Sequence, residues 1–254
     1  MNLKVPEFYL ILEADYMKSY NYNKNREKAV ALSGKTEAVP VLMYHWFYDL
    51  ERGRKPNDQG GNWISAQVFD EQMKYLHDNN YYYASWDELR EWIDNKIDLP
   101  RKTICLTDDD AYITFFTIAM PIFQKYEIPF TSFISTSVCD NKRDMLAFAS
   151  DPFVTFESHS DRLHAHWDIC YGKNVKELYE DIRKSVSYIG NHEVFAYPFG
   201  QYTEEYIEAL KMNDFKLAFT TVNTKVKRGM NHYALPRVRI SKDMSLDDYI
   251  RAIS

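Results

Sequence analysis

Short apolar runs alternate with longer segments that have helical spacing from about residue 39 to the end of the chain. The apolar runs predict strands at residues 39–44, 103–107, 130–136, 154–156, 194–197, 217–221 and 235–240. The helical spacing predicts helices at residues 65–79, 86–94, 111–126, 175–189 and 203–213, and a last one from residue 245. Because strands and helices alternate, parallel β/α units are the economical architecture.

Several helix starts carry their own signals. Ser65 can cap a helix that places Phe69, Met73 and Leu76 on one face. Ser85 caps the next helix, with a Glu at the capping-box position three residues later. The helix predicted at 111–126 contains Pro121, so it forms either one helix or two pieces that break near this proline.

The first part of the chain differs from the rest. Residues 1–38 form a polar N-terminal extension, in which 16–32 has helical spacing but many Asn and Lys residues. Residues 51–62, rich in Gly, Asn, Arg and Lys, predict an exposed loop. No internal repeat or linker divides residues 39–254, so we expect one catalytic domain there. A chain of 254 residues is long enough for one α/β barrel.

Composition narrows the class of protein. Hydrophobic residues make up 45% of the chain and charged residues 27%, which is typical of a globular protein. A net charge of −6 gives no reason to expect nucleic acid or an anionic membrane as a partner. Aromatic residues make up 16%, which suits core packing or, as an alternative, stacking against sugar rings.

The three cysteines are widely spaced and form no CxxC pair, which excludes a zinc finger based on cysteine. We expect Cys105, Cys139 and Cys170 to be free. No stretch approaches the length of an apolar membrane span. The apolar run at residues 8–12 has acidic flanks and is too short for a signal peptide. The protein is therefore expected in the cytoplasm, or outside the cell or at its surface if an export signal has been removed.

Three consecutive acidic residues, Asp108, Asp109 and Asp110, close an apolar strand. Adjacent like charges repel, so this position requires a compensating cation or proton. A later apolar run is followed by His159 and His164. A carboxylate and two imidazoles are a common ligand set for a divalent metal that keeps a position open for water. The pattern indicates a metal-dependent hydrolase, although the acids could instead cap the following helix.

Three motifs follow predicted strands in a recognisable order. Residues 106–112 read Leu-Thr-Asp-Asp-Asp-Ala-Tyr, residues 156–164 read Phe-Glu-Ser-His-Ser-Asp-Arg-Leu-His, and residues 196–200 read Ala-Tyr-Pro-Phe-Gly. They resemble the Thr-Phe-Asp-Asp-Gly, His-Ser/Thr and Pro-Tyr-Gly motifs of carbohydrate esterase family four, the NodB-type polysaccharide deacetylases. The resemblance runs from about residue 39 to the C-terminus and implies an α/β fold, a distorted (β/α)7-type barrel.

Two details resemble one branch of that family. Four residues separate His159 from His164, one more than in most members, and His45 lies near the start of the domain. Both are similar to the branch that deacetylates poly-β-1,6-N-acetylglucosamine, in which the last catalytic motif is permuted to the front.

The resemblance also implies roles for individual residues. Aligning Thr107 with the Thr of the first motif puts Asp109 at the general-base position and Asp110 at a metal-ligand position. His159 and His164 align with the two metal-binding histidines. One divalent metal is implied. Zinc suits two His and one Asp, and cobalt, nickel or iron would also fit.

The remaining implied roles concern proton transfer and the oxyanion. His45 aligns with the general acid, and the backbone N–H of Phe199 aligns with the oxyanion donor. Water activated at the metal would attack the amide, Asp109 would take its proton, and an imidazole that titrates near neutrality could protonate the departing amine.

The chain departs from the family pattern in three places. Ala111 stands where Gly is usual, so we expect the turn to avoid positive φ. Asp108 replaces an apolar Phe, which leaves Asp108 and Asp109 as an alternative working pair. The third motif lacks its usual Arg, and we hypothesise that Arg237, in the last predicted strand, supplies that guanidinium to the base.

The resemblance implies an enzyme that releases acetate from N-acetylglucosamine units of a polysaccharide, with poly-β-1,6-N-acetylglucosamine as the first expectation. Peptidoglycan and chitin oligosaccharides are the alternative substrates. A sugar-binding relative with impaired catalysis is an alternative of a different class.

Overall fold

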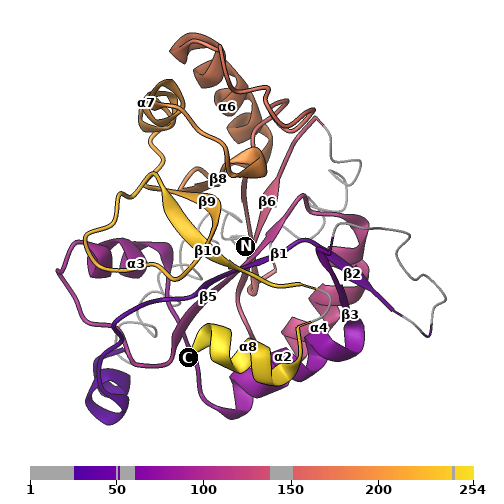
Figure 1. Ribbon diagram of the computed structural model, residues 1–254, viewed down its shortest axis with the longest axis vertical. Helices are drawn as coiled ribbons and strands as arrows, with labels where there is room; N and C mark the ends of the chain where they lie inside the picture. Colours follow the sequence, from indigo (N-terminus) through magenta and orange to yellow (C-terminus); the bar gives the residue numbers. More distant parts are fainter. Residues whose placement is uncertain (1–25, 50, 52–60, 138–150, 242–243) are drawn as a thin grey trace, which may run out of the picture.

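A computed structural model describes residues 26–49, 51, 61–137, 151–241 and 244–254 (Figure 1). Residues 26–33 are helical, as their spacing predicts. The rest of the polar segment before them, most of the predicted loop at 51–62 and Cys139 lie outside the described residues.

A parallel sheet forms the centre of the fold. Its strands are β1 (Val41–Tyr44), β4 (Tyr82–Tyr83), β5 (Thr103–Asp109), β6 (Phe130–Ile134), β7 (Val154–Ser158), β8 (Val194–Ala196), β9 (Leu217–Asn223) and β10 (Leu235–Arg239). They pair in the order β1-β10-β9-β8-β7-β6-β5-β4, and β5 also pairs with β1. A single register pair joins β7 to β8, and the register shifts between β10 and β9. The predicted α/β fold of a distorted barrel is therefore confirmed.

Helices pack around this sheet. They are α2 (Ala66–Asp78), α3 (Trp86–Ile93), α4 (Met120–Lys125), α6 (Val175–Ile189), α7 (Glu204–Met212) and α8 (Leu246–Ile253). Figure 1 shows α6 and α7 together on one side and α2, α4 and α8 together on the other. Among the described residues, no helix has the length and apolar character to span a membrane.

The predicted helix starts are confirmed. The Ser65 side chain accepts a hydrogen bond from the N–H of Val68, and Ser85 and Glu88 form a complete capping box. Of the two alternatives for residues 111–126, the structure has one continuous helical segment whose type changes near Pro121, where a π-helical turn, η1 (Phe115–Ala119), runs directly into α4. Proline has no N–H to donate within a helix, which favours a change of helix type there.

Some elements were not predicted. Strands β2 (Trp46–Tyr48) and β3 (Trp63–Ser65) form a separate parallel pair, and the two-residue strand β4 pairs with the start of β5. Strand β5 continues to Asp109, beyond its predicted end at Thr107, because residues 107–109 pair with residues 131–133 of β6. The acidic residues Asp108 and Asp109 therefore belong to the strand itself.

The alternation of side chains along β5 decides which acid faces which way. Leu106 packs in the aromatic cluster beneath α2 and α4, whereas Cys105 packs with Val41 and Phe219 inside the barrel. Because successive side chains of a strand point to opposite faces, Asp109 shares the inner face with Cys105. Cys105 and Cys170 are free and buried, as expected.

Candidate metal centre

Three predicted ligands come together at the carboxyl ends of β5 and β7. One ligand atom from each of Asp110, His159 and His164 lies within 4.8 Å of the others. The Asp110 Oδ1 atom is 3.2 Å from His164 Nε2 and 3.8 Å from His159 Nε2. Residues 110 and 159 follow two strands separated only by β6, so the sheet brings them to one end of the barrel.

The surroundings of these side chains fit a divalent cation. Asp110 Oδ1 is buried and has no hydrogen-bond partner among the described residues. Burial and the neighbouring Asp109 raise the pKa of Asp110 to about 7. A carboxylate in this position lacks a compensating positive charge, which a cation would supply.

The orientation and the pKa values of the two histidines suit metal binding. The Nδ1–H of His159 donates to the backbone oxygen of Ala196 at 2.6 Å, which orients the ring and leaves Nε2 free to ligate. Burial lowers the pKa of His159 to about 3 and also lowers the pKa of His164. Both rings are therefore neutral at pH 7, which is the form that binds a metal.

Asp109 forms a buried, two-pronged ion pair with Arg237 of β10. The guanidinium lies 2.6 Å from Asp109 Oδ1 and 2.7 Å from Oδ2. It also donates to the Thr107 hydroxyl at 3.1 Å and to the Thr220 backbone oxygen at 3.2 Å. Burial would raise the pKa of Asp109, but Arg237 outweighs it and holds that pKa well below its usual range. Asp109 is therefore ionised, and the guanidinium hypothesised for the base does reach it.

His45 also lies close to Asp109. Its Nε2 atom is 3.9 Å from Asp109 Oδ2, and its Nδ1 atom is buried without a hydrogen-bond partner among the described residues. Burial lowers the pKa of His45 to about 4, although Asp109 opposes this shift. His45 is therefore neutral at pH 7 before any reaction begins.

Phe199 lies in a tight turn, η2 (Pro198–Gly200), that follows β8. Its ring stacks on His164 with centroids 4.6 Å apart, so this turn forms one wall of the metal centre. The turn requires glycine at residue 200, because φ is +76° and a Cβ atom there would lie 2.6 Å from the backbone N of Thr221. The role predicted for the Phe199 N–H stays a prediction.

The contacts of the three acids show which of them lies beside the histidines. Asp108 accepts a hydrogen bond from Ser132 at 3.0 Å and another from the backbone N–H of Ala111. Burial raises the pKa of Asp108 well above its usual value, with both neighbouring acids adding to the shift. The structure thus groups Asp110, and not Asp108, with the histidines.

The expectation that Ala111 avoids positive φ is wrong. Asp110 has φ of +76° and Ala111 has φ of +48°, so two successive residues are left-handed without a glycine. This conformation costs roughly 1–2 kcal/mol per residue. Ala111 is fully buried in the aromatic cluster and its N–H is held by Asp108, and these contacts offset the strain.

Two residues that support Arg237 were not predicted from the sequence. Thr107 and Thr220 fix the Arg237 guanidinium, and the signal for Thr107 was its place in the first motif. His166, two residues beyond a ligand, is exposed and pairs with Asp168 at 3.2 Å. It lies outside the group formed by Asp110, His159 and His164.

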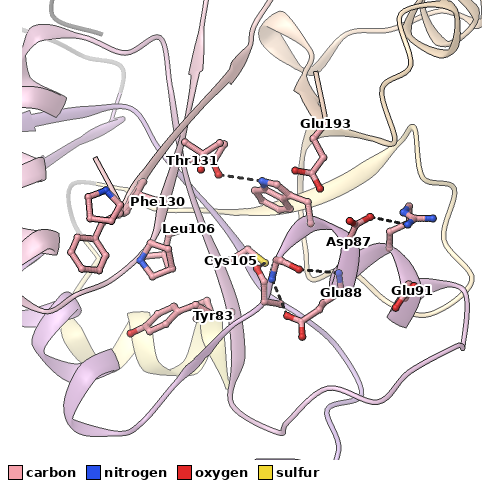
Figure 2. Close-up of a pocket in the computed structure, with 18 residues that line it drawn as sticks. Tyr83, Asp87, Glu88, Glu91, Cys105, Leu106, Phe130, Thr131 and Glu193 are labelled. Carbon is pink, nitrogen blue, oxygen red and sulfur yellow. Dashed lines mark hydrogen bonds and ion pairs between the residues drawn. The ribbon is translucent and has the colours of Figure 1, made fainter. Parts of the chain in front are cut away.

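A cavity of about 820 Å³ lies elsewhere in the fold (Figure 2). Its walls include Tyr83, Cys105, Phe130 and Thr131, near the amino ends of β5 and β6, together with acidic residues of α3. None of the predicted site residues lines it. The predicted chemistry therefore belongs to the opposite end of the barrel.

Comparisons with known proteins find a matching family model and similar chains. Residues 96–218 match the family model described as Polysaccharide deacetylase. The poly-β-1,6-N-acetyl-D-glucosamine N-deacetylase of Staphylococcus epidermidis is 26% identical over 202 residues, which cover 71% of this chain and 68% of that protein. The protein of the same name from Staphylococcus aureus (strain MSSA476) is 25% identical over 248 residues, covering 90% of this chain and 83% of that protein.

A solved structure shares the fold. The Streptococcus pyogenes deacetylase PplD in complex with acetate superposes with a TM-score of 0.72 at 21% identity, covering 85% of this chain and 98% of that chain. The resemblance to polysaccharide deacetylases is therefore confirmed.

Zinc should stabilise the folded chain through the three ligands. At a free zinc concentration 100 times the Kd, we expect about 2.7 kcal/mol of added stability, seen as a higher melting temperature. His164→Ala should lose this gain because it removes a ligand. His166→Ala, an exposed histidine two residues away, should keep it. Equal zinc-induced shifts in both variants would contradict the site.

Replacing Arg237 should expose the dependence of the fold on its ion pair. Arg237→Met leaves Asp109 buried and unpaired, so we expect a loss of roughly 3–5 kcal/mol at pH 7 in urea unfolding. Because the pKa of Asp109 is lower in the folded state, the pair stabilises the wild type above about pH 4 and less as pH falls. The difference between variant and wild type should therefore shrink in acid.

The exposed ion pair between Arg251 and Asp248 provides the control for this prediction. Arg251→Met should change the free energy of unfolding little at any pH, since exposed ion pairs contribute little. A similar small effect of Arg237→Met would show that the buried pair is not a constraint on the fold.

Proposed function

We propose that this chain, which carries a polysaccharide deacetylase domain, removes N-acetyl groups from N-acetylglucosamine units of a polysaccharide and releases acetate. One observation carries the proposal: the ionised Asp109 and the neutral His45 lie close to each other and next to the group of Asp110, His159 and His164. Hydrolysis of an amide needs a site for activated water, a proton acceptor and a proton donor, and these residues can supply all three.

Asp110, His159 and His164 would hold one divalent cation. When bound, such a cation supplies Lewis-acid chemistry, which makes water more acidic and polarises a carbonyl. Two imidazoles and one carboxylate suit zinc, and cobalt, nickel or iron are also compatible with this ligand set.

Asp109 is the proposed general base. Arg237 keeps its carboxylate ionised and fixes both oxygens, so that it can accept a proton from the attacking water. A base held in one orientation loses little entropy when the reaction begins. Arg237 thus acts through Asp109 and is a positioning residue.

His45 is the proposed general acid. At rest it is neutral, since burial lowers its pKa to about 4, so it must gain a proton before it can donate one. Asp109 Oδ2 is only 3.9 Å from His45 Nε2, so a proton that reaches Asp109 has a short path to His45 and then to the departing amine. The backbone N–H of Phe199 is the proposed donor to the oxyanion.

The proposed polymer is poly-β-1,6-N-acetylglucosamine. The staphylococcal relatives named for this substrate support it, as do the early position of His45 and the spacing of His159 and His164. Exposed aromatic rings on the two segments beside His164 could stack on sugar rings, and they belong to Trp167, Tyr171, Phe199 and Tyr202.

Acetate release should identify the polymer. We expect faster release from poly-β-1,6-N-acetylglucosamine than from chitin oligosaccharides or peptidoglycan, with an enzymatic acetate assay as the measurement. Asp109→Asn serves as the matched inactive control on each polymer. A clear preference for either alternative polymer would overturn the proposed substrate, and zinc-dependent binding of all three without acetate release would favour a sugar-binding protein.

Removing either proton-transfer group should slow turnover without removing the metal. We expect Asp109→Asn and His45→Gln each to lower kcat by about 10²–10⁴, because neither side chain is a proposed ligand. Zinc affinity, measured on the same variants, should remain within a few-fold of the wild type. Full activity in either variant would reject its assigned role.

A further inference from the structure

The segment between His159 and His164 is held from outside the barrel by helix α6. Three α6 residues, Asp181, Lys184 and Ser185, lie at spacings of three and four and so share one face of the helix. Each has a hydrogen-bond partner in or next to this segment. None of the three was identified from the sequence.

Asp181 makes the most specific of these contacts. Its Oδ1 atom accepts a hydrogen bond from the backbone N–H of Asp161 at 2.9 Å, and its Oδ2 atom accepts one from the N–H of Arg162, also at 2.9 Å. Hydrogen bonds to a charged acceptor are roughly twice as strong as neutral ones. One half-buried carboxylate thus fixes two successive peptide units of the segment.

Further contacts hold the same segment, two from α6 and one from Thr136, which follows β6. The Asp161 carboxylate is 1% exposed and accepts hydrogen bonds from Thr136 and from Lys184, each at 2.7 Å. Ser185 pairs with Ser158 at 2.8 Å, just before the first ligand. The segment is therefore fixed between β6 and α6.

The backbone of this segment includes one unfavourable conformation. Ser160 has φ of +74°, which is unfavourable for a residue with a Cβ atom. The Ser160 hydroxyl accepts the N–H of Leu163 at 3.1 Å, and Leu163 is buried against α6 and α7. The segment also holds one residue more than in most of the family that the sequence resembles, so its path needs its own support.

We propose that Asp181 is a positioning residue that fixes the segment carrying His164 and thereby sets the affinity of the centre for a divalent cation. His159 is anchored separately, through Ala196 of β8, whereas His164 depends on the path of residues 160–163. Both Asp181 oxygens are engaged by backbone N–H groups, so Asp181 acts through the ligand. The inference rests on the cation site of the proposed function.

Zinc affinity, measured by competition with a chromophoric chelator, tests the proposal. Asp181→Asn places an amide NH₂ against a backbone N–H, and we expect the Kd for zinc to rise about 10–100-fold. Glu180→Gln is the matched control, because it removes one negative charge from the adjacent, exposed position of α6. The Kd of the Glu180→Gln variant for zinc should equal that of the wild type.

The melting temperature of the metal-free protein separates positioning from folding. We expect Asp181→Asn to remain folded, with a loss of zinc affinity that persists well below its melting temperature. If that variant does not fold, Ser160→Gly decides, because glycine tolerates the positive φ while the hydrogen bond to Leu163 is lost. Weaker zinc binding by folded Ser160→Gly would support the proposal.

Different results would overturn the cation site and the role of Asp181. A wild-type chain that binds no zinc would overturn the cation site itself. Wild-type affinity in folded Asp181→Asn, or in Ser160→Gly if the first variant does not fold, would overturn the positioning role and leave the proposed function intact.

Discussion

Two opposite charges, Asp109 and Arg237, meet inside the barrel, where an unpaired charge would be strongly unfavourable. The guanidinium extends from β10 to β5, which both pair with β1, and it also bonds to the Thr220 backbone of β9. Its donors are satisfied only when these strands keep their register, because a one-residue slip would turn Asp109 to the outer face. The ion pair therefore links the register of the sheet to the ionisation of the proposed base.

The three consecutive acids coexist because the strand and its end separate them. Asp108 points outward to Ser132, and burial raises its pKa well above the usual value, which favours its neutral form. Asp109 points inward and is neutralised by Arg237. Asp110 leaves the strand in a left-handed turn and reaches the histidines, where its Oδ1 atom has no hydrogen-bond partner among the described residues and a cation would compensate its charge. The repulsion within this run of acids is thus reduced in three ways, by the raised pKa of Asp108, by the guanidinium beside Asp109 and by the candidate metal site at Asp110.

Local signals predicted much of this fold. The caps at Ser65 and Ser85 depend on residues within one turn of each other, so a sequence pattern can show them. The motifs likewise marked the three side chains that the structure brings together, because each motif follows a strand that ends at the same side of the barrel. The left-handed Ala111 and the hold of Asp181 on the segment before His164 were not visible, since both depend on partners that only the folded chain brings close.

The two histidines of the candidate metal centre are supported by different parts of the fold. His159 follows β7 directly and its ring bonds to Ala196 at the end of β8, so the barrel itself holds it. His164 is one turn further on, stacks on Phe199 and depends on a segment fixed by α6. The position of His159 therefore depends on the sheet, whereas the position of His164 depends on the packing of α6 against the sheet. Changes in α6 would then alter the geometry of the cation site without disturbing Asp109, Arg237 or His45.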